Sequence, residues 1–301
     1  MEWFRGFMNL FHLVISKDIN QLSMKLIFVL IIAVNFISCH SQTNTADAVI
    51  AISKTKEDTV TLHRNPGQKI IHVFVALCDN KYQGIVPVPK AIGNGQDPAN
   101  NLYWGCSYGV KTYFKNSKQW QFVKSINSPQ HPVLERCIFR HKNSNTYLVA
   151  DAYDGQYIRN CTKDFLKSCA GLLSDSATLA DGKKIYTDGN ADLLAYVGHD
   201  GLMDFSISEQ YNCKDTLKRE TIILACISKK YFAAHLKSTN AKPLIWSTGL
   251  MSPEAYTLHD AIESWIGGKP DSFVRESAAK AYSRYQQCSD KAAKNLLVSG
   301  W

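Results

Sequence analysis

Residues 191–201 read ADLLAYVGHDG, and residues 220–226 read ETIILAC. Each stretch is a short apolar run, and the runs stop at Gly198 and at Ala225-Cys226. Short apolar runs bounded by turn residues are typical of strands that are buried on both faces of a parallel sheet. Because function gathers at the carboxyl ends of the strands in open α/β sheets, the residues that end these two runs are the first candidates for chemistry.

The rest of the chain repeats this pattern of apolar runs and helical stretches. Three further predicted strands cover residues 70–78, 145–153 and 242–248. The predicted helices cover residues 102–114, 157–173, 253–265 and 271–297. Short strands alternating with helices predict an α/β fold, with a doubly wound, mainly parallel sheet and C-terminal helices.

Two chemically capable residues stand at the ends of the two opening runs. His199 follows the first run and Cys226 ends the second. If the two strands are neighbours, an imidazole near a thiol can stabilise a thiolate, or can act as a general base that later protonates a leaving amine. Glycines let the backbone approach a substrate carbonyl, so the amides around Gly198 and Gly201 are candidate oxyanion donors. Trp246, in the last predicted strand, is a candidate for lining a substrate groove.

These motifs resemble those of the caspase-like cysteine peptidases, the clan of caspases, gingipains, legumains and metacaspases. In that fold one strand ends in apolar residues and His-Gly, and the next ends in apolar residues, Ala or Ser, and Cys. The corresponding stretches here are LAYVGHDG (194–201) and IILACIS (222–228). The segment DNKYQG (79–84) is similar to the family's Asn-Tyr-x-Gly turn after its first strand, and residues 94–104 match a further family stretch loosely.

The resemblance covers residues 70–248 and implies a cysteine endopeptidase. Cys226 would be the nucleophile and His199 the general acid/base, with an acyl-enzyme thioester, a peptide or protein substrate, no cofactor and no metal. Two features depart from the family: Asp200 interrupts the His-Gly pair, and the short interval to Cys226 leaves room for only a brief crossover helix between residues 206 and 219.

Asp79, after the first predicted strand, is the candidate for substrate selectivity. In this clan the loop at that point helps to form the pocket for the residue before the cut bond, and an acid there favours Arg or Lys. The alternative is that Asp79 is simply a turn residue at a strand end.

Other readings of the whole domain remain open. One is a catalytically inactive caspase-like lipoprotein of the cell envelope that binds a peptide or protein partner. Another is an unrelated α/β protein, and a third is an acyl hydrolase or transferase that uses the same Cys and His. A metal site around His259, Glu254 and Glu263 competes with a solvated helix face, which the sequence favours.

The N-terminal region predicts export. Residues 24–39 read MKLIFVLIIAVNFISC, in which one Lys precedes an apolar run of about a dozen residues, shorter than a membrane span. The end of this stretch resembles a relaxed bacterial lipobox, so Cys39 is the predicted lipidation site, with residues 24–38 the signal peptide and 1–23 an over-extended gene start. An uncleaved N-terminal anchor is the alternative. The protein is therefore expected in the bacterial cell envelope, on the periplasmic side.

The remaining boundaries and partners follow from composition. Residues 39–69 are the predicted tether and linker, and residues 70–301 the caspase-like domain. The chain has a formal charge of +8, to which residues 1–38 contribute only +1, from three basic and two acidic residues. Lys and Arg are scattered, which disfavours a nucleic-acid partner and suits a membrane surface with anionic lipids. No Cys or His group in the sequence has zinc-site spacing.

Overall fold

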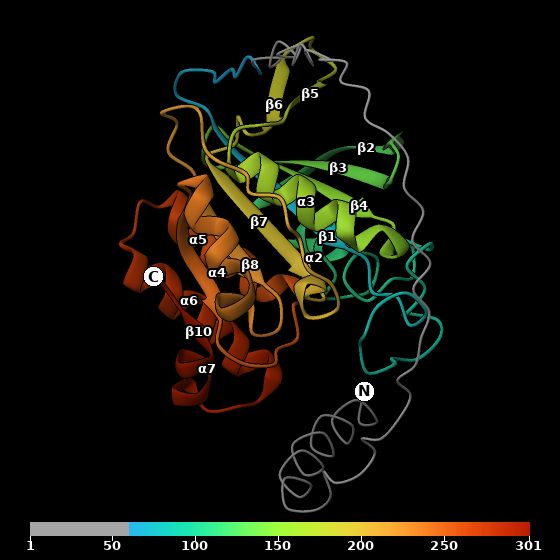
Figure 1. The fold of residues 1–301 in the computed structure, drawn as a ribbon. Coiled ribbons are helices and arrows are strands. Elements are labelled where there is room, and N and C mark those ends of the chain that lie inside the picture. The colour runs from blue at the N-terminus through green and yellow to red at the C-terminus, as the bar shows by residue number, and fades with distance from the viewer. Residues whose placement is uncertain (1–59) are drawn as a thin grey trace, which may run out of the picture. The chain divides into compact units, whose positions relative to one another are not determined.

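A computed structural model describes residues 60–301, and its centre is an eight-stranded sheet. Five strands form its parallel part, in the order β9-β8-β7-β1-β4 (Figure 1). Their bounds are β1 (Lys69–Ala76), β4 (Thr146–Tyr153), β7 (Leu193–Gly198), β8 (Glu220–Leu224) and β9 (Lys242–Ser247). These are the five strands that the apolar runs predict, and the mostly parallel α/β architecture is confirmed.

Antiparallel strands complete both edges of the sheet. The long hairpin of β2 (Trp120–Gln130) and β3 (Val133–His141) extends the β4 side, and the short β10 (Leu297–Val298) pairs with β9. A separate hairpin, β5 (Ser174–Thr178) and β6 (Lys184–Asp188), stands apart from the sheet. These strands leave no apolar run in the sequence: β2 and β5 are partly exposed, and the mostly buried β3 is interrupted by Glu135, Arg136 and Arg140.

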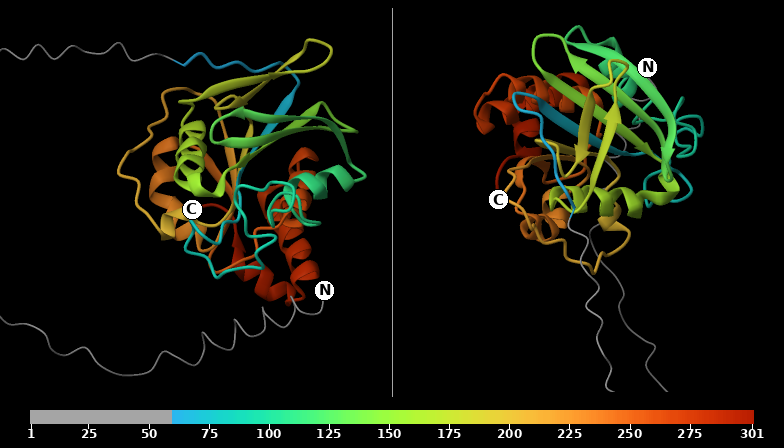
Figure 2. Two further views of the ribbon diagram at one scale, coloured as in Figure 1. Left: turned by 90° about the vertical axis from the view of Figure 1, so that its right-hand side faces the viewer. Right: turned by 90° about the horizontal axis from the view of Figure 1, so that it is seen from above.

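Helices cover both faces of the sheet (Figure 2). On one face lie α3 (Ile158–Cys169) and α4 (Ser228–Thr239); on the other lie α2 (Val110–Asn116), α5 (Ala255–Ile266) and α6 (Asp271–Gln286). The alternation of side chains along β1 serves both layers, because Val73 and Val75 join the core under α5 and α6 while Phe74 joins the core under α3 and α4. The sheet is therefore buried on both sides, as its apolar strands require.

Two of the predicted helices have clearly different bounds in the structure, and a third is absent. Turns occupy most of residues 102–109, so α2 begins only at Val110. The predicted helix 271–297 breaks at Gln287, whose φ of 55° is left-handed, and the chain resumes as α7 (Asp290–Leu296). The crossover helix expected between residues 206 and 219 is wrong: that segment has no helix, and the 3-10 turn η2 (Gly201–Met203) precedes it. Ile207 and Tyr211 of this segment are buried in the core that contains α3 and α4, although the segment is not helical.

The compact unit that contains the sheet includes all of residues 60–301. Its structure begins before β1, because the Arg64 guanidinium donates to the carbonyls of Asn190 and Ala191 and pairs with Asp192 at 3.1 Å. The predicted gene-start extension, signal peptide and Cys39 lipidation site lie outside the described residues. Within residues 60–301 no helix is long and apolar enough to cross a membrane, and the eight cysteines there are free thiols.

Candidate active site at the ends of β7 and β8

The two residues of the predicted dyad follow neighbouring parallel strands. β7 and β8 pair in register up to Val197 and Leu224. His199 lies two residues beyond Val197, and Cys226 lies two residues beyond Leu224. The fold therefore brings both residues to the same carboxyl edge of the sheet, where open α/β sheets place their functional groups.

His199 is held by an acidic partner that the sequence analysis did not single out. Its ring is 7% exposed, and Nε2 lies 2.8 Å from Oδ2 of Asp204, just after η2. The backbone carbonyl of His199 accepts a hydrogen bond from the Tyr196 hydroxyl at 2.8 Å. The histidine is thus fixed at its backbone and at one ring nitrogen.

The Cys226 thiol is half-buried against the loop after β9. Met251 N–H donates to Sγ at 3.4 Å, and Sγ lies 3.5 Å from the Met251 carbonyl oxygen. Burial raises the pKa of this thiol, the Met251 amide opposes the rise, and the charge of Asp200 adds to it. Among the hydrogen bonds of residues 60–301, none joins Cys226 to His199, so the thiol is not hydrogen-bonded to the imidazole.

The turn that follows the thiol has an unusual backbone. Ile227, at the N-cap of α4, has φ 51° and ψ 28°, a left-handed conformation that a β-branched residue rarely adopts. Its N–H donates to the Gly249 carbonyl at 2.8 Å, so it is not free to bind an oxyanion. Strained backbone of this kind costs about 1–3 kcal/mol and clusters at functional sites.

Asp200 introduces a second acidic group at this edge. It is fully buried: Oδ1 accepts the Leu202 N–H at 3.0 Å, while Oδ2 has no hydrogen-bond partner. Burial raises its pKa to about 7, a rise that the Leu202 amide limits and the charge of Asp204 increases. The sequence analysis treated Asp200 only as an interruption of the family motif, and the structure shows it as a buried carboxyl in electrostatic contact with Cys226.

The two glycines of this turn have packing reasons of their own. Gly198 has φ +145°, and a Cβ there would stand 2.6 Å from the Ala76 carbonyl oxygen of β1. A Cβ at Gly201 would stand 2.6 Å from the ring of Phe205. Glycine at position 198 therefore allows the end of β7 to pack closely against β1. This packing role is independent of the predicted role of its amide as an oxyanion donor.

Asp79 lies buried at the end of β1, with its carboxylate occupied by the chain itself. Oδ1 accepts the N–H groups of Lys81 and Tyr82 at 2.8 and 3.2 Å, and Oδ2 accepts Gln96 Nε2 at 2.8 Å. The same Gln96 amide donates to Asp154 at 2.6 Å. This is the arrangement of a turn residue that shapes the loop after β1, and a basic substrate side chain would reach Asp79 only by displacing Gln96.

Trp246 does not face solvent. The ring is fully buried in β9 and packs edge-on against Trp301, with centroids 5.4 Å apart. A pocket of about 310 Å³ is formed by residues 202–206 together with Tyr231 and His235 of α4, and neither His199 nor Cys226 lines it.

His259 is also buried, contrary to the solvated face that its helix suggests. It is 7% exposed, and its Nε2 lies 2.9 Å from Ser117 Oγ. Within residues 60–301 no group of three or more His, Cys, Asp or Glu side chains is arranged to hold a metal ion.

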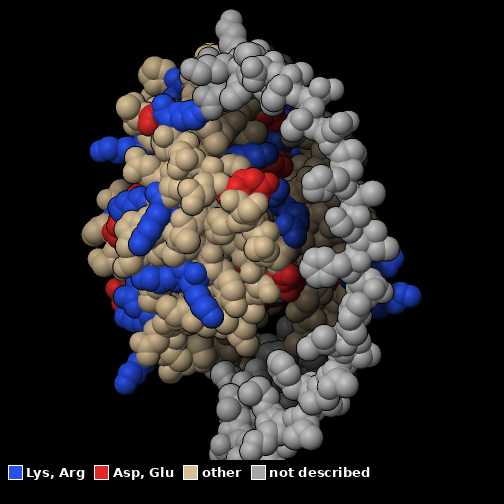
Figure 3. Space-filling model, viewed as in Figure 1, with Lys and Arg blue, Asp and Glu red and all other residues tan. Residues whose placement is uncertain are grey.

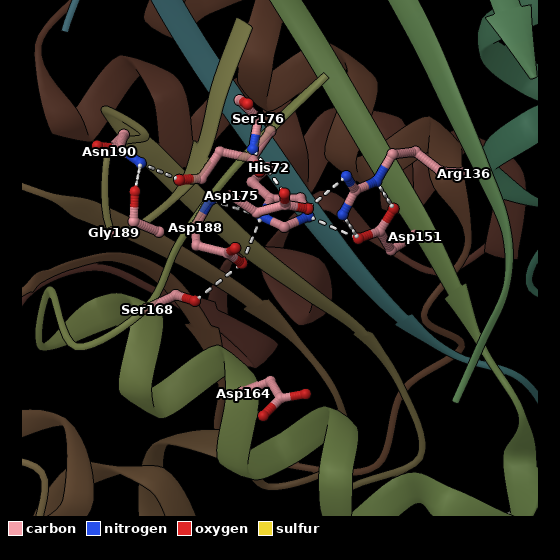
Figure 4. A network of polar contacts seen from close by, with 12 residues as sticks. His72, Arg136, Asp151, Asp164, Ser168, Asp175, Ser176, Asp188, Gly189 and Asn190 are labelled. Carbon is pink, nitrogen blue, oxygen red and sulfur yellow. Dashed lines mark hydrogen bonds and ion pairs between the residues drawn. The ribbon is translucent and has the colours of Figure 1, made fainter. Parts of the chain in front are cut away.

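A second polar cluster, which sequence reasoning missed, joins strands of the main sheet to the β5–β6 hairpin (Figure 4). His72 of β1 is fully buried, with Nε2 3.0 Å from Asp151 Oδ2 and Nδ1 3.3 Å from Asp188 Oδ1. Arg136 donates to both oxygens of Asp151 at 2.7 Å and also pairs with Asp175. The sequence did hold one sign of this cluster, because His72 and Asp151 interrupt the otherwise apolar strands β1 and β4.

Electrostatics holds this cluster in its charged form. Burial alone would lower the His72 pKa, but Asp151 and Asp188 outweigh it and raise the pKa to about 9. Burial likewise would raise the Asp151 pKa, but Arg136 and His72 lower it to about 2. His72 aligns with Leu194, near the start of β7, so the cluster lies away from the carboxyl edge that carries His199.

No protein-family model, no curated protein and no solved structure matches this chain. The geometry of the site at the ends of β7 and β8 is therefore the basis on which a function can be assigned.

Proposed function

We propose that this protein is a cysteine endopeptidase of the caspase-like type, with Cys226 as nucleophile and His199 as general acid/base. The observation that carries the proposal is the placement of His199 and Cys226 directly after two adjacent parallel strands. Two further observations support it: the strained turn at Ile227 and the acidic partner on His199. The parallel strand order β4-β1-β7-β8-β9 also supports the proposal. His199 follows β7 and Cys226 follows β8, which are the third and fourth parallel strands along the chain.

The raised pKa of the Cys226 thiol favours proton removal during attack over a preformed ion pair. His199 would take the thiol proton as Sγ attacks the peptide carbonyl, giving a tetrahedral intermediate. This intermediate would collapse to a thioester while His199 returns the proton to the leaving amine. Water would then hydrolyse the thioester with His199 again acting as base.

We also propose a cellular location for the reaction. The signal-peptide layout of residues 24–38 and the lipobox-like Cys39 support a lipid-anchored protein that cuts peptides or proteins on the outer side of the cytoplasmic membrane. Figure 3 shows Lys and Arg side chains spread over the viewed face, with acidic side chains among them. A dispersed basic surface suits anionic lipid headgroups.

A second candidate is a non-catalytic caspase-like module that binds a peptide or protein partner. The observation in its favour is the resting state of Cys226, whose thiol has a raised pKa and bonds only to the Met251 backbone. Iodoacetamide labelling separates the two readings. A catalytic Cys226 is alkylated faster than the other accessible thiols, whereas a structural one reacts no faster than Cys213.

Peptide-library cleavage tests the proposal directly. Residues 48–301 contain the whole compact unit and would be assayed under mild reductant as wild type, Cys226→Ala and Cys213→Ala. Cleavage that is lost only in Cys226→Ala establishes the peptidase, and a basic residue before the cut supports the role of Asp79. Absence of cleavage by folded wild-type protein refutes the enzyme and favours the binding module.

A further inference from the structure

The Asp204 carboxylate joins two parts of the chain at the candidate site. Its Oδ2 accepts from His199 Nε2 at 2.8 Å and from the backbone N–H of Gly84 at 2.9 Å. The backbone N–H of Asp204 donates to the Gly201 carbonyl at 2.9 Å, which fixes the residue at the end of η2. The carboxylate is 30% exposed, whereas the His199 ring is 7% exposed, so the ion pair lies at the edge of the buried histidine.

The approach of Gly84 depends on its lack of a side chain. A Cβ at this position would stand 2.3 Å from Asp204 Oδ1 and 3.0 Å from its Cγ. The loop that carries Gly84 is itself held in place, because the Gln83 amide donates to the carbonyls of Leu77 and Gly155 at 2.7 and 3.1 Å. The Gly84 amide is therefore a preorganised donor that holds the carboxylate in one position.

A carboxylate can only accept, so Nε2 of His199 must carry the proton that it shares with Asp204. In the neutral ring the free lone pair is then on Nδ1. We infer that Asp204, held by Gly84, is the positioning residue of His199: it selects the tautomer that leaves Nδ1 as the basic atom. The inference rests on the proposed function for its catalytic meaning, although the tautomer itself does not depend on it.

In the proposed reaction the Sγ–H bond of Cys226 breaks and its proton goes to Nδ1. The ring becomes an imidazolium, whose charge the Asp204 carboxylate offsets at Nε2. The loop after β1 thus acts on the base through Gly84, although neither Gly84 nor Asp204 touches the thiol in any hydrogen bond of residues 60–301. A loop distant in sequence thereby controls the orientation of His199.

The test uses ¹⁵N-histidine NMR on residues 48–301, with the His199 signals assigned from a His199→Ala variant. In the wild type at alkaline pH we expect the chemical shifts of a ring protonated at Nε2. In Asp204→Asn and in Gly84→Ala we expect signals averaged between the two tautomers. Asp181→Asn, an exposed aspartate, and Gly267→Ala, where a Cβ meets nothing closer than 3.5 Å, are the matched controls and should leave the wild-type signals.

Cleavage kinetics supply the second readout. Asp204→Asn should lower kcat by at least about tenfold with little change in KM, because an orienting carboxylate acts on the base and not on substrate binding. A wild-type ring protonated at Nδ1, or one whose tautomer is unchanged in Asp204→Asn, would overturn the inference even if the protein cleaves peptides. If no peptide is cleaved but the tautomer shifts as expected, the endopeptidase proposal fails and the positioning role of Asp204 stands.

Discussion

Replacing Asp200 by Asn should change the dependence of stability on pH. The free energy of unfolding of the variant, compared with that of the wild type, should increase from acidic to neutral and alkaline pH. Asp200 is fully buried, and one of its oxygens has no hydrogen-bond partner. Its pKa is raised from 3.8 to about 7, so the folded protein holds a proton that the unfolded chain releases above pH 4. Wild-type stability therefore falls as the pH rises from about 4 to about 7, and the loss is complete above pH 7.

A rise in pKa of this size corresponds to about 4 kcal/mol at pH 8. Asparagine does not ionise and avoids this cost, although its amide N–H groups would be buried without a partner at about 1–3 kcal/mol. That second cost does not depend on pH. The change with pH in the stability difference between variant and wild type should therefore be about 4 kcal/mol between pH 4 and pH 8, whatever the absolute offset.

Urea unfolding followed by tryptophan fluorescence at pH 4, 5, 6, 7 and 8 measures this difference, with Asp181→Asn as the control for an exposed carboxylate. A stability difference between Asp200→Asn and wild type that stays within about 1 kcal/mol from pH 4 to pH 8 would show that Asp200 is not a buried acid with a raised pKa. Because the Asp200 charge also raises the thiol pKa, the variant should shift the pH midpoint of Cys226 alkylation downward. Asp200 thus destabilises the folded protein near the candidate nucleophile. Such a loss of stability is typical of residues that are kept for function.

Three other predictions concern the stability of the fold. The raised His72 pKa contributes about 3 kcal/mol to the free energy of unfolding below pH 6.5, and this contribution is lost as the pH rises to about 9. In the variant His72→Gln, urea unfolding between pH 6 and pH 9.5 should no longer show this loss. Gly198→Ala should lower stability by more than about 2 kcal/mol in the same assay, because of its φ and its contact with Ala76, while Gly267→Ala changes it by less than about 1 kcal/mol. Ile227→Gly should raise the free energy of unfolding by about 1 kcal/mol by removing left-handed strain, and a decrease would mean that side-chain packing outweighs that strain.

The sequence was sufficient for the frame of the fold. Strands buried on both faces need apolar side chains at nearly every position, so β1, β4, β7, β8 and β9 each leave a readable run. Since parallel strands end at a common edge, the placement of His199 and Cys226 after two neighbouring strands could also be predicted. The β2–β3 hairpin and the break at Gln287 could not be predicted. Polar and charged residues interrupt the apolar residues of both strands, and a single left-handed residue leaves no periodic signal.

The sequence by itself thus determined which strands form the parallel part of the sheet and which two reactive residues follow neighbouring strands at its edge. Only the tertiary structure decided the electrostatics of that edge: the Asp204 carboxylate on His199, the unpartnered oxygen of Asp200 and the Gln96 amide on Asp79. Burial and distance set the charge state of such groups, and both come from segments far apart in the chain. Gly84 and Asp204, 120 positions apart, meet only because β1 and β7 are neighbours.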